Sequence, residues 1–346
     1  MLLDIVFLIA GLTALVWSAD QFVLGSSRLG LLLSLPPVVI GAVVMGFGTS
    51  APELLVSSLA AASGDRDLGV GNIVGSNVAN LTLVLGTAAF VTRMPIQRAV
   101  LRREAPLAIG AALVFSAFVV DGRIARWEGA VLVGLLIGVI LLLIRSGRAE
   151  VLDDIIGDEV EPLSKGREAG RTIIGLIGTV LGAQLVVWGA TDIAEELGVT
   201  GGFIGFSLVA LGTSLPELVT TVAAARRGET GLIVGNLFGS NIFNALAVGG
   251  GMGLIGPGLI GDDSLTTYGL AAMLAVAAVS FLLSIGGSID RPRGVVLLAL
   301  YVGAMVLLAV QEEELIDEEP AAEVTVEAVS VPNGFGEHGP RYEPQS

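Results

Sequence analysis

Long apolar runs recur along this chain from its first residues to about residue 311. A membrane-spanning helix needs about 20 mainly apolar residues, and continuous runs favour helices over the alternating pattern of a β-barrel. Ten segments fit this description: 2–24, 36–62, 69–91, 104–120, 127–145, 171–195, 203–225, 230–256, 265–285 and 294–311. The pattern therefore predicts an all-α membrane protein with ten transmembrane helices in one membrane domain.

Two stretches of the chain repeat each other at an offset of 164 residues. Gly-Thr-Ser-x-Pro-Glu occupies 48–53 and 212–217, and Gly-Asn-x-x-Gly-Ser-Asn-x-x-Asn occupies 71–80 and 235–244. From residue 48 to residue 80 the two copies agree at 17 of 33 positions without a gap, which chance similarity of composition would not produce. We therefore expect a duplication of five spans. Because five is odd, the second copy enters the membrane from the opposite face. Such inverted repeats are typical of secondary transporters, whose site lies between the repeats.

The duplication divides the chain into four parts. We expect a first five-helix repeat over 1–145, an acidic linker over 146–170, a second repeat over 171–311, and an acidic, disordered tail over 312–346. If both termini lie outside the cell, 14 of the 18 Lys and Arg residues fall on the inside and 4 on the outside. The positive-inside rule then predicts a multi-pass cell-membrane protein with a cytoplasmic linker and extracytoplasmic termini.

Composition agrees with a membrane location and narrows the chemistry. Charged residues make up 15% of the chain, against about 25% in soluble proteins, and the mean hydropathy is +0.83. Cysteine is absent, and the single histidine, His338, lies in the polar tail. Disulfides, thiolate or histidine metal sites and histidine-based catalytic triads are therefore excluded from the membrane region, and we expect no enzyme activity. No basic patch with interleaved aromatic residues is present, so nucleic acid is not an expected partner.

Two acidic side chains, Glu53 and Glu217, lie well inside apolar segments. A carboxylate at this depth costs a few kcal/mol or more unless it is paired, protonated or bound to a cation. We place all basic residues in loops or tails, so a buried salt bridge is not expected. Protonated structural glutamates remain an alternative, but two symmetric acids that converge on a metal or proton site explain the repeat better. Pro52 and Pro216 lack N–H donors and are expected to free main-chain carbonyls near Gly46 to Thr49 and near Ala210 to Thr213.

The second motif places polar side chains on one helix face in each repeat. Asn72, Ser76 and Asn80 recur every four residues, and their counterparts are Asn236, Ser240 and Asn244. Carboxylate, amide, hydroxyl and carbonyl oxygens are ligands for hard cations such as Ca²⁺ and Na⁺, whereas softer metals prefer His or Cys. Two carboxylates balance one divalent charge or a comparable set of monovalent ions, which would permit exchange.

At these motifs the chain resembles the sodium/calcium exchangers of the cation/calcium exchanger superfamily. The resemblance implies a secondary active antiporter in the lipid bilayer that exchanges Na⁺ for Ca²⁺ by alternating access and needs no cofactor. It implies that Glu53 and Glu217 bind Ca²⁺, helped by the backbone at Thr49 and Thr213, and that the helices near 2–24 and 171–195 slide past the other helices. Further oxygen ligands, including those of flanking sodium sites, are expected from Ser50, Ser76, Ser214, Ser240, Asn80, Asn244, Gly46 and Ala210.

Departures from the family pattern bear on the coupling ion. Some relatives, including potassium-dependent ones, carry an aspartate at the position of Asn244, so potassium coupling is not expected here. Proton-coupled relatives carry an acid where this chain keeps Gly-Ser-Asn, which favours sodium, with a proton-coupled Ca²⁺ antiporter as the alternative. An intramembrane hydrolase lacks a membrane-embedded base, and a cation channel would not need inverted repeats.

Overall fold

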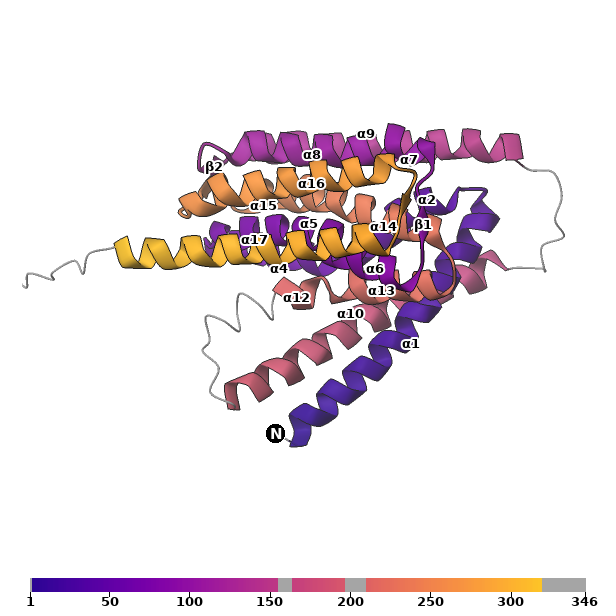
Figure 1. The fold of residues 1–346 in the computed structure, drawn as a ribbon, viewed down its shortest axis with the longest axis horizontal. Coiled ribbons are helices and arrows are strands. Elements are labelled where there is room, and N and C mark those ends of the chain that lie inside the picture. Colours follow the sequence, from indigo (N-terminus) through magenta and orange to yellow (C-terminus); the bar gives the residue numbers. More distant parts are fainter. Residues whose placement is uncertain (1, 155–163, 197–209, 319–346) are drawn as a thin grey trace, which may run out of the picture.

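The computed structural model describes residues 2–154, 164–196 and 210–318, and nearly all of this chain is helical (Figure 1). The helices of the first half are α1 (Leu2–Leu33), α2 (Pro37–Ile40), α3 (Phe47–Thr49), α4 (Ala51–Ser63), α5 (Arg66–Ala79), α6 (Leu85–Val91), α7 (Arg98–Arg102), α8 (Glu104–Val119) and α9 (Arg126–Asp154). Those of the second half are α10 (Lys165–Glu196), α12 (Ala210–Thr213), α13 (Leu215–Arg226), α14 (Thr230–Phe243), α15 (Gly249–Ile255), α16 (Leu270–Ile285) and α17 (Arg291–Glu318).

Four short π-helical segments lie within or between these helices. They are η1 (Gly41–Gly46), η2 (Asn80–Val84), η4 (Asn244–Val248) and η5 (Leu265–Gly269). Segment η2 joins α5 to α6 in one continuous helix, and η4 joins α14 to α15 in the same way. The widened turns therefore begin at equivalent positions of the two repeats, and π-turns inside α-helices are frequent at functional sites.

Helices occupy each of the ten segments that the sequence predicts, although residues 203–209 of the seventh lie outside the described part. By length and composition, six helices in the described ranges could cross a membrane: Asp4–Leu33, Arg66–Val91, Arg126–Gly147, Lys165–Ile193, Thr230–Ile255 and Leu265–Ile285. A seventh span results if Pro37–Thr49 and Ala51–Ser63, which are bent by 43°, are taken together. The structure thus supports a helical membrane fold with six or seven spans by these criteria.

Several helices extend further than the apolar pattern predicts. Helix α1 continues to Leu33 and ends at Ser34, whose φ of 52° and nearby prolines stop it. Arg28, which we placed in a loop, therefore lies in a helix, as do Arg145 and Arg171. Long apolar stems let such side chains reach water from the last turns of a span, so helix ends and hydropathy ends differ. Helices α9 and α10 also cover part of the acidic linker.

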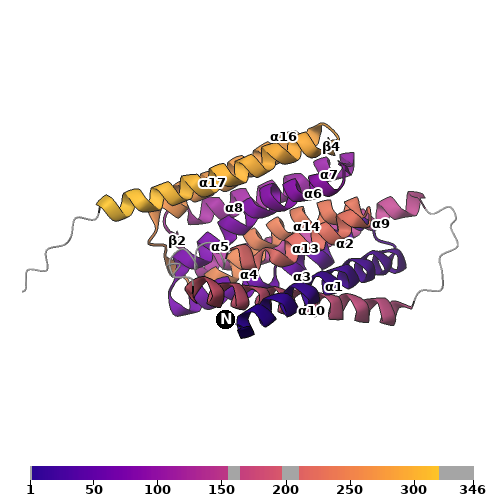
Figure 2. The ribbon, with the colours of Figure 1, turned by 60° about the horizontal axis from the view of Figure 1, so that its bottom comes forward.

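The two helices that carry the Asn motif lie at the centre of the molecule. In its most apolar window, the α14–α15 helix is 94% buried and the α5–α6 helix is 78% buried, whereas α1, α9 and α10 are only 22–28% buried. Large apolar side chains such as Trp17, Leu135 and Leu181 are exposed on these outer helices, as expected for surfaces that face lipid. Figures 1 and 2 show α1 and α10 side by side, and in Figure 1 both run oblique to the other long helices.

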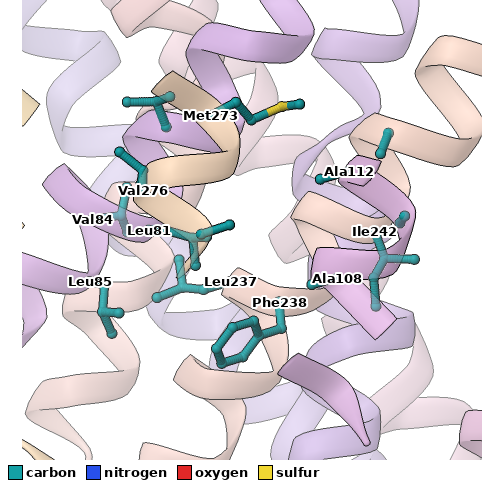
Figure 3. Close-up of a cluster of buried hydrophobic side chains, with 14 of the residues drawn as sticks. Leu81, Val84, Leu85, Ala108, Ala112, Leu237, Phe238, Ile242, Met273 and Val276 are labelled. Atoms are coloured by element: carbon teal, nitrogen blue, oxygen red, sulfur yellow. The ribbon is translucent and has the colours of Figure 1, made fainter. Parts of the chain in front are cut away.

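Apolar side chains from both repeats fill the space around the central helices (Figure 3). Leu81 and Leu237 come from equivalent central segments, and Ala108 of α8 and Met273 of α16 pack around them. Each of these four side chains is at most 4% exposed. The two repeats therefore share one core and do not form separate domains.

Helices α1 and α10 form a closely packed antiparallel pair. Leu8, Leu15 and Phe22 of α1 lie against Gly189, Gly182 and Gly175 of α10 in steps of seven residues. A Cβ at Gly175 would lie 2.5 Å from the backbone nitrogen of Phe22, so only glycine allows this approach. Small residues at helix contacts are the usual basis of tight packing in membranes. Gly11 and Gly25 of α1 likewise lie against α10, so each of the two helices contributes glycines to the contact.

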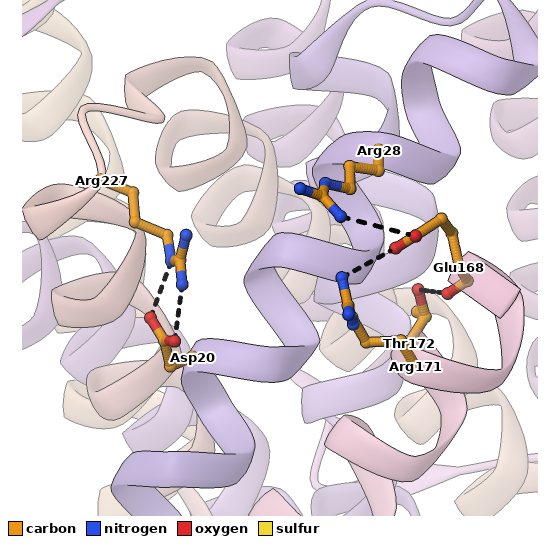
Figure 4. A network of polar contacts seen from close by, with 6 residues as sticks. All are labelled: Asp20, Arg28, Glu168, Arg171, Thr172 and Arg227. Atoms are coloured by element: carbon orange, nitrogen blue, oxygen red, sulfur yellow. Dashed lines mark hydrogen bonds and ion pairs between the residues drawn. The ribbon is translucent and has the colours of Figure 1, made fainter. Parts of the chain in front are cut away.

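Polar contacts add to this pair and link it to the rest of the molecule (Figure 4). Within the pair, Glu168 lies 3.6 Å from the Arg28 guanidinium and 3.2 Å from that of Arg171. Between the pair and the other helices, Arg227 forms a two-pronged ion pair with Asp20, at 2.7 and 2.6 Å. This interaction raises the pKa of the Arg227 guanidinium. The glycine contacts and ion pairs make α1 and α10 one unit, tied to the remaining helices at this end.

Two short strand ladders mark opposite ends of the molecule (Figure 2). Strand β1 (Met94–Pro95) pairs with β4 (Ser288–Ile289), and β2 (Arg123–Ile124) pairs with β3 (Gly258–Leu259), both antiparallel. Each ladder joins a loop of the first repeat to a loop of the second, so the repeats are connected at both ends.

Candidate cation-binding site

Each Gly-Thr-Ser-x-Pro-Glu motif forms a break between two helices. Ser50 has ψ of 11° and Ser214 has ψ of 0°, and a new helix begins directly after each of them. Pro52 and Pro216 sit in the first turn of the new helix, where an N–H donor is not needed. The glutamate that follows therefore also lies in a first turn, where the helix dipole stabilises negative charge.

Both glutamates are completely buried. Glu53 and Glu217 have no exposed surface, and neither forms an ion pair with a described basic residue. Oε1 of Glu217 accepts a hydrogen bond of 3.0 Å from the Ser50 hydroxyl. Oε2 of Glu217 and both oxygens of Glu53 have no partner among the described residues. The structure therefore shows both acids buried, as the sequence predicts.

Hydroxyl and amide groups connect the two repeats next to these acids. The Thr49 hydroxyl lies 3.4 Å from Oδ1 of Asn236, and the Thr213 hydroxyl lies 3.3 Å from Oδ1 of Asn72. The motif of one repeat thus contacts the asparagine of the other, and the contact occurs twice. Each asparagine also donates to a hydroxyl of its own repeat, on Ser57 at 2.9 Å or Thr221 at 3.4 Å.

A second polar layer lies where η2 and η4 begin. The Asn80 amide donates to Oδ1 of Asn241 at 3.1 Å, and the Asn241 amide donates to the main-chain oxygen of Asn77 at 3.1 Å. Both polar atoms of the Asn244 side chain and Oδ1 of Asn80 are buried without a described partner. Asn77 and Asn241 are not among the predicted ligands. The signal that could have found them is their identity in both copies of the motif.

The hydrogen bonds of the site are not symmetric. Ser50 donates to Glu217, and Ser240 donates to the main-chain oxygen of Gly46 at 3.2 Å. Their counterparts in the other repeat, Ser214 and Ser76, have hydroxyls without a described partner. The hydroxyls of Ser50 and Ser240 are therefore hydrogen-bonded within the protein, whereas those of Ser76 and Ser214 are unpaired among the described residues.

One expectation for the carbonyls is wrong for Gly46. Its oxygen accepts hydrogen bonds of 3.2 Å from the Ser50 N–H and of 3.2 Å from the Ser240 hydroxyl, so it is not freed by Pro52. Proline removes the donor for the carbonyl four residues earlier, which is Gly48. Position 46 lies too early in the helix to lose its donor.

The structure buries most of the predicted ligands, and hydrogen bonds join some of them: Ser50 to Glu217, and Ser240 to Gly46. All of those whose side chains are described are at most 7% exposed: Thr49, Ser50, Glu53, Ser76, Asn80, Thr213, Ser214, Glu217, Ser240 and Asn244. Ala210 is the first residue of α12, and its side chain is outside the described part. No group of three or more His, Cys, Asp and Glu side chains suited to a metal occurs in the described ranges. The acids among the predicted ligands are Glu53 and Glu217, and the other predicted ligands are neutral.

Comparison with known proteins places this arrangement in a family. The family model described as sodium/calcium exchanger protein matches residues 3–145 and 169–310. The protein CaxA of Alkalimonas amylolytica is 36% identical over 89% of this chain and 99% of its own length. The sodium/calcium exchanger MaX1 of Methanosarcina acetivorans is 30% identical over 88% of this chain and 98% of its own.

Solved structures agree with the sequence relatives. A structure of the sodium-calcium exchanger NCX_Mj superimposes with a TM-score of 0.78 and 32% identity, covering 89% of this chain and 99% of that one. The chain is therefore a multi-pass membrane protein of the sodium/calcium exchanger family, a family of exchangers and not of enzymes.

Proposed function

We propose that this chain is a secondary active antiporter that exchanges Na⁺ for Ca²⁺ by alternating access, with Ca²⁺ held between Glu53 and Glu217. One observation carries the proposal. Two carboxylates, one from each repeat, are fully buried, and neither has a basic partner among the described residues. An unpaired buried carboxylate costs several kcal/mol, and a bound cation removes that cost.

The chemistry of the ligands fits hard cations. Ca²⁺ takes six to eight oxygen ligands in a flexible cage. Two carboxylates supply its charge, and the remaining oxygens come from the backbone at Thr49 and Thr213 and from the nearby hydroxyls and amides. Unpaired oxygens on Ser76, Ser214 and Asn244 are available to sodium ions that flank the carboxylates. Either set of ions neutralises the site, which lets the loaded protein change its orientation.

The architecture fits alternating access. Helices α1 and α10 occupy equivalent positions in the two repeats, yet they run antiparallel in the structure. Antiparallel packing of equivalent helices is what inverted repeats produce. On this basis the ten helical segments form two inverted bundles of five, and the α1–α10 pair moves as a unit past the others. The distribution of Lys and Arg along the chain supports extracytoplasmic termini.

Sodium is the preferred coupling ion. The polar stripe on α5 and α14 holds hydroxyls and amides, which can coordinate Na⁺ but cannot accept a proton near neutral pH. MaX1 is named a sodium/calcium exchanger, which supports the same choice. The alternative is a proton-coupled Ca²⁺ antiporter in which the two glutamates themselves carry protons.

Uptake of labelled calcium into proteoliposomes tests the proposal. Vesicles loaded with Na⁺ and diluted into Na⁺-free medium should accumulate Ca²⁺, and Glu53→Gln should abolish the uptake. A proton gradient without sodium should not drive it. Uptake under the proton gradient alone would favour the alternative, and no calcium flux under either gradient would overturn the antiporter assignment.

A further inference from the structure

The amide group of Asn80 is held in one orientation by a chain of two hydrogen bonds. The chain begins at the main-chain oxygen of Asn77, which can only accept. The group on Asn241 that faces this oxygen at 3.1 Å must therefore be its NH₂. Oδ1 of Asn241 then points the other way, toward Asn80.

The orientation of Asn241 fixes that of Asn80. Because Oδ1 of Asn241 can only accept, the group on Asn80 that faces it at 3.1 Å must be the NH₂. Oδ1 of Asn80 is thereby turned away from this contact, buried, and without a partner among the described residues.

A buried polar atom without a partner requires an explanation. Oδ1 of Asn77 is also unpaired among the described residues, so this observation alone does not identify a ligand. Asn80 differs because it shares a helix face with Asn72 and Ser76. The Asn77 amide instead lies against Met273 of α16.

We propose that Asn241 is a positioning residue of the cation site, which orients the Asn80 amide so that its oxygen and not its NH₂ faces the transported cation. This inference rests on the proposed function, because it takes Asn80 as an oxygen ligand. An amide turned by 180° would present two N–H donors to the cation and would repel it. Asn241 itself does not touch the ion and acts only through Asn80.

The pseudo-symmetric position provides a contrast within the same molecule. Asn77 is the counterpart of Asn241, and it is buried to the same degree, with 1% exposure against 4%. Its NH₂ donates to the sulfur of Met273 at 3.3 Å, and its Oδ1 has no described partner. The Asn77 side chain therefore orients neither Asn80 nor Asn244. Only its main-chain oxygen takes part in the chain, and a substitution of the side chain retains that oxygen.

Asn241→Leu tests the assignment because leucine has a similar volume and cannot form either hydrogen bond. In sodium-loaded proteoliposomes we expect the KM for Ca²⁺ to rise by about threefold to tenfold, the worth of one neutral hydrogen bond, with a smaller change in maximal rate. Asn77→Leu is the matched control and should leave KM near that of the unmodified chain. Asn241→Leu combined with Asn80→Ala should be no worse than Asn80→Ala alone, since Asn241 acts through Asn80.

The outcomes distinguish failure of the positioning role of Asn241 from failure of the proposed exchange function. An unchanged KM in Asn241→Leu, an equal rise in Asn77→Leu, or multiplied effects in the double variant would each overturn the positioning role while leaving exchange intact. Absence of calcium transport by the unmodified chain would overturn the proposed function and this assignment with it. If Asn241→Leu is not recovered as a monodisperse protein, Asn241→Gln is measured in the same cycle, with the same expected rise in KM and the same non-additivity with Asn80→Ala.

Discussion

Ser50 and Ser214 occupy equivalent positions in the two repeats and have nearly the same backbone conformation, yet their side chains differ in bonding. The Ser50 hydroxyl donates to the Glu217 carboxylate, whereas the Ser214 hydroxyl has no described partner. Both side chains are buried, with 0% and 3% exposure. The difference in hydrogen bonding between Ser50 and Ser214 is therefore not caused by a difference in solvent exposure.

This difference leads to a prediction about stability in the absence of cations. Ser50→Ala should destabilise the protein by about 1.5–3 kcal/mol, because a hydrogen bond to a charged group is lost and Glu217 stays buried. Ser214→Ala should change stability by less than about 0.5 kcal/mol. Thermal unfolding in detergent without Na⁺ or Ca²⁺ measures both. Equal losses for the two variants would contradict the asymmetry.

Among the elements, the α1–α10 pair depends on glycine for its packing. A methyl group at Gly175 would lie 2.5 Å from backbone of Phe22, whereas a methyl group at Gly138 of α9 would meet no described atom within 4 Å. Gly175→Ala should destabilise the protein by about 1–3 kcal/mol through overpacking. Gly138→Ala should be neutral or slightly stabilising, as alanine favours helix. Thermal unfolding measures the stability of both variants. Equal unfolding temperatures would show that the close approach at Gly175 does not require glycine.

The ion pair between Asp20 and Arg227 connects the α1–α10 pair to α13 in the conformation described here. If the pair of helices slides during transport, this contact must break. Arg227→Gln should then shift the population toward the other conformation by a factor of up to about 5, since a partly exposed ion pair contributes up to about 1 kcal/mol. The neighbouring Arg226, which is exposed and outside this ion pair, provides the control Arg226→Gln.

The shift in conformational population can be measured by double electron-electron resonance between two spin labels. The chain has no cysteine, so spin labels can be placed at Lys165→Cys on α10 and Arg98→Cys on α7, both exposed positions, without removing native thiols. The distance distribution should change for Arg227→Gln and not for Arg226→Gln. Identical distributions in both would indicate that the ion pair does not stabilise this conformation.

For the whole molecule, the inverted topology makes a prediction about sidedness. Ala62 and Arg226 are equivalent in the repeats, 164 residues apart, and both are exposed at helix ends. Ala62→Cys should react with an impermeant maleimide added to intact cells, and Arg226→Cys should react only after permeabilisation. Labelling of both from the same side would contradict inverted repeats.

Much of the arrangement could be predicted because the relevant signals are periodic. The apolar runs located helices at all ten segments, and the four-residue spacing of Asn72, Ser76 and Asn80 placed them on one buried face. The repeat at an offset of 164 residues also identified the two acids that the structure buries completely. Each of these features depends on spacing along the chain, which a single sequence contains.

The remaining features depend on contacts between distant segments. The sequence near Asn241 does not indicate that its amide NH₂ donates to the main-chain oxygen of Asn77 while its Oδ1 accepts from Asn80. The engaged carbonyl of Gly46 and the one-sided bonding of Ser50 likewise reflect the conformation of the folded chain. Helix ends were misjudged at Arg28 because hydropathy falls before the helix stops.

The central claim, that Glu53 and Glu217 together hold the transported cation, is tested most directly by calorimetric titration of the purified protein with Ca²⁺. Binding should be displaced by Na⁺, and Glu53→Gln and Glu217→Gln should each weaken it by at least about tenfold, the smallest loss typical even for residues behind the metal ligands. Asp121→Asn, an exposed acid paired with Arg123, should bind as the unmodified chain does. Calcium binding of unchanged affinity in either glutamine variant would contradict the claim.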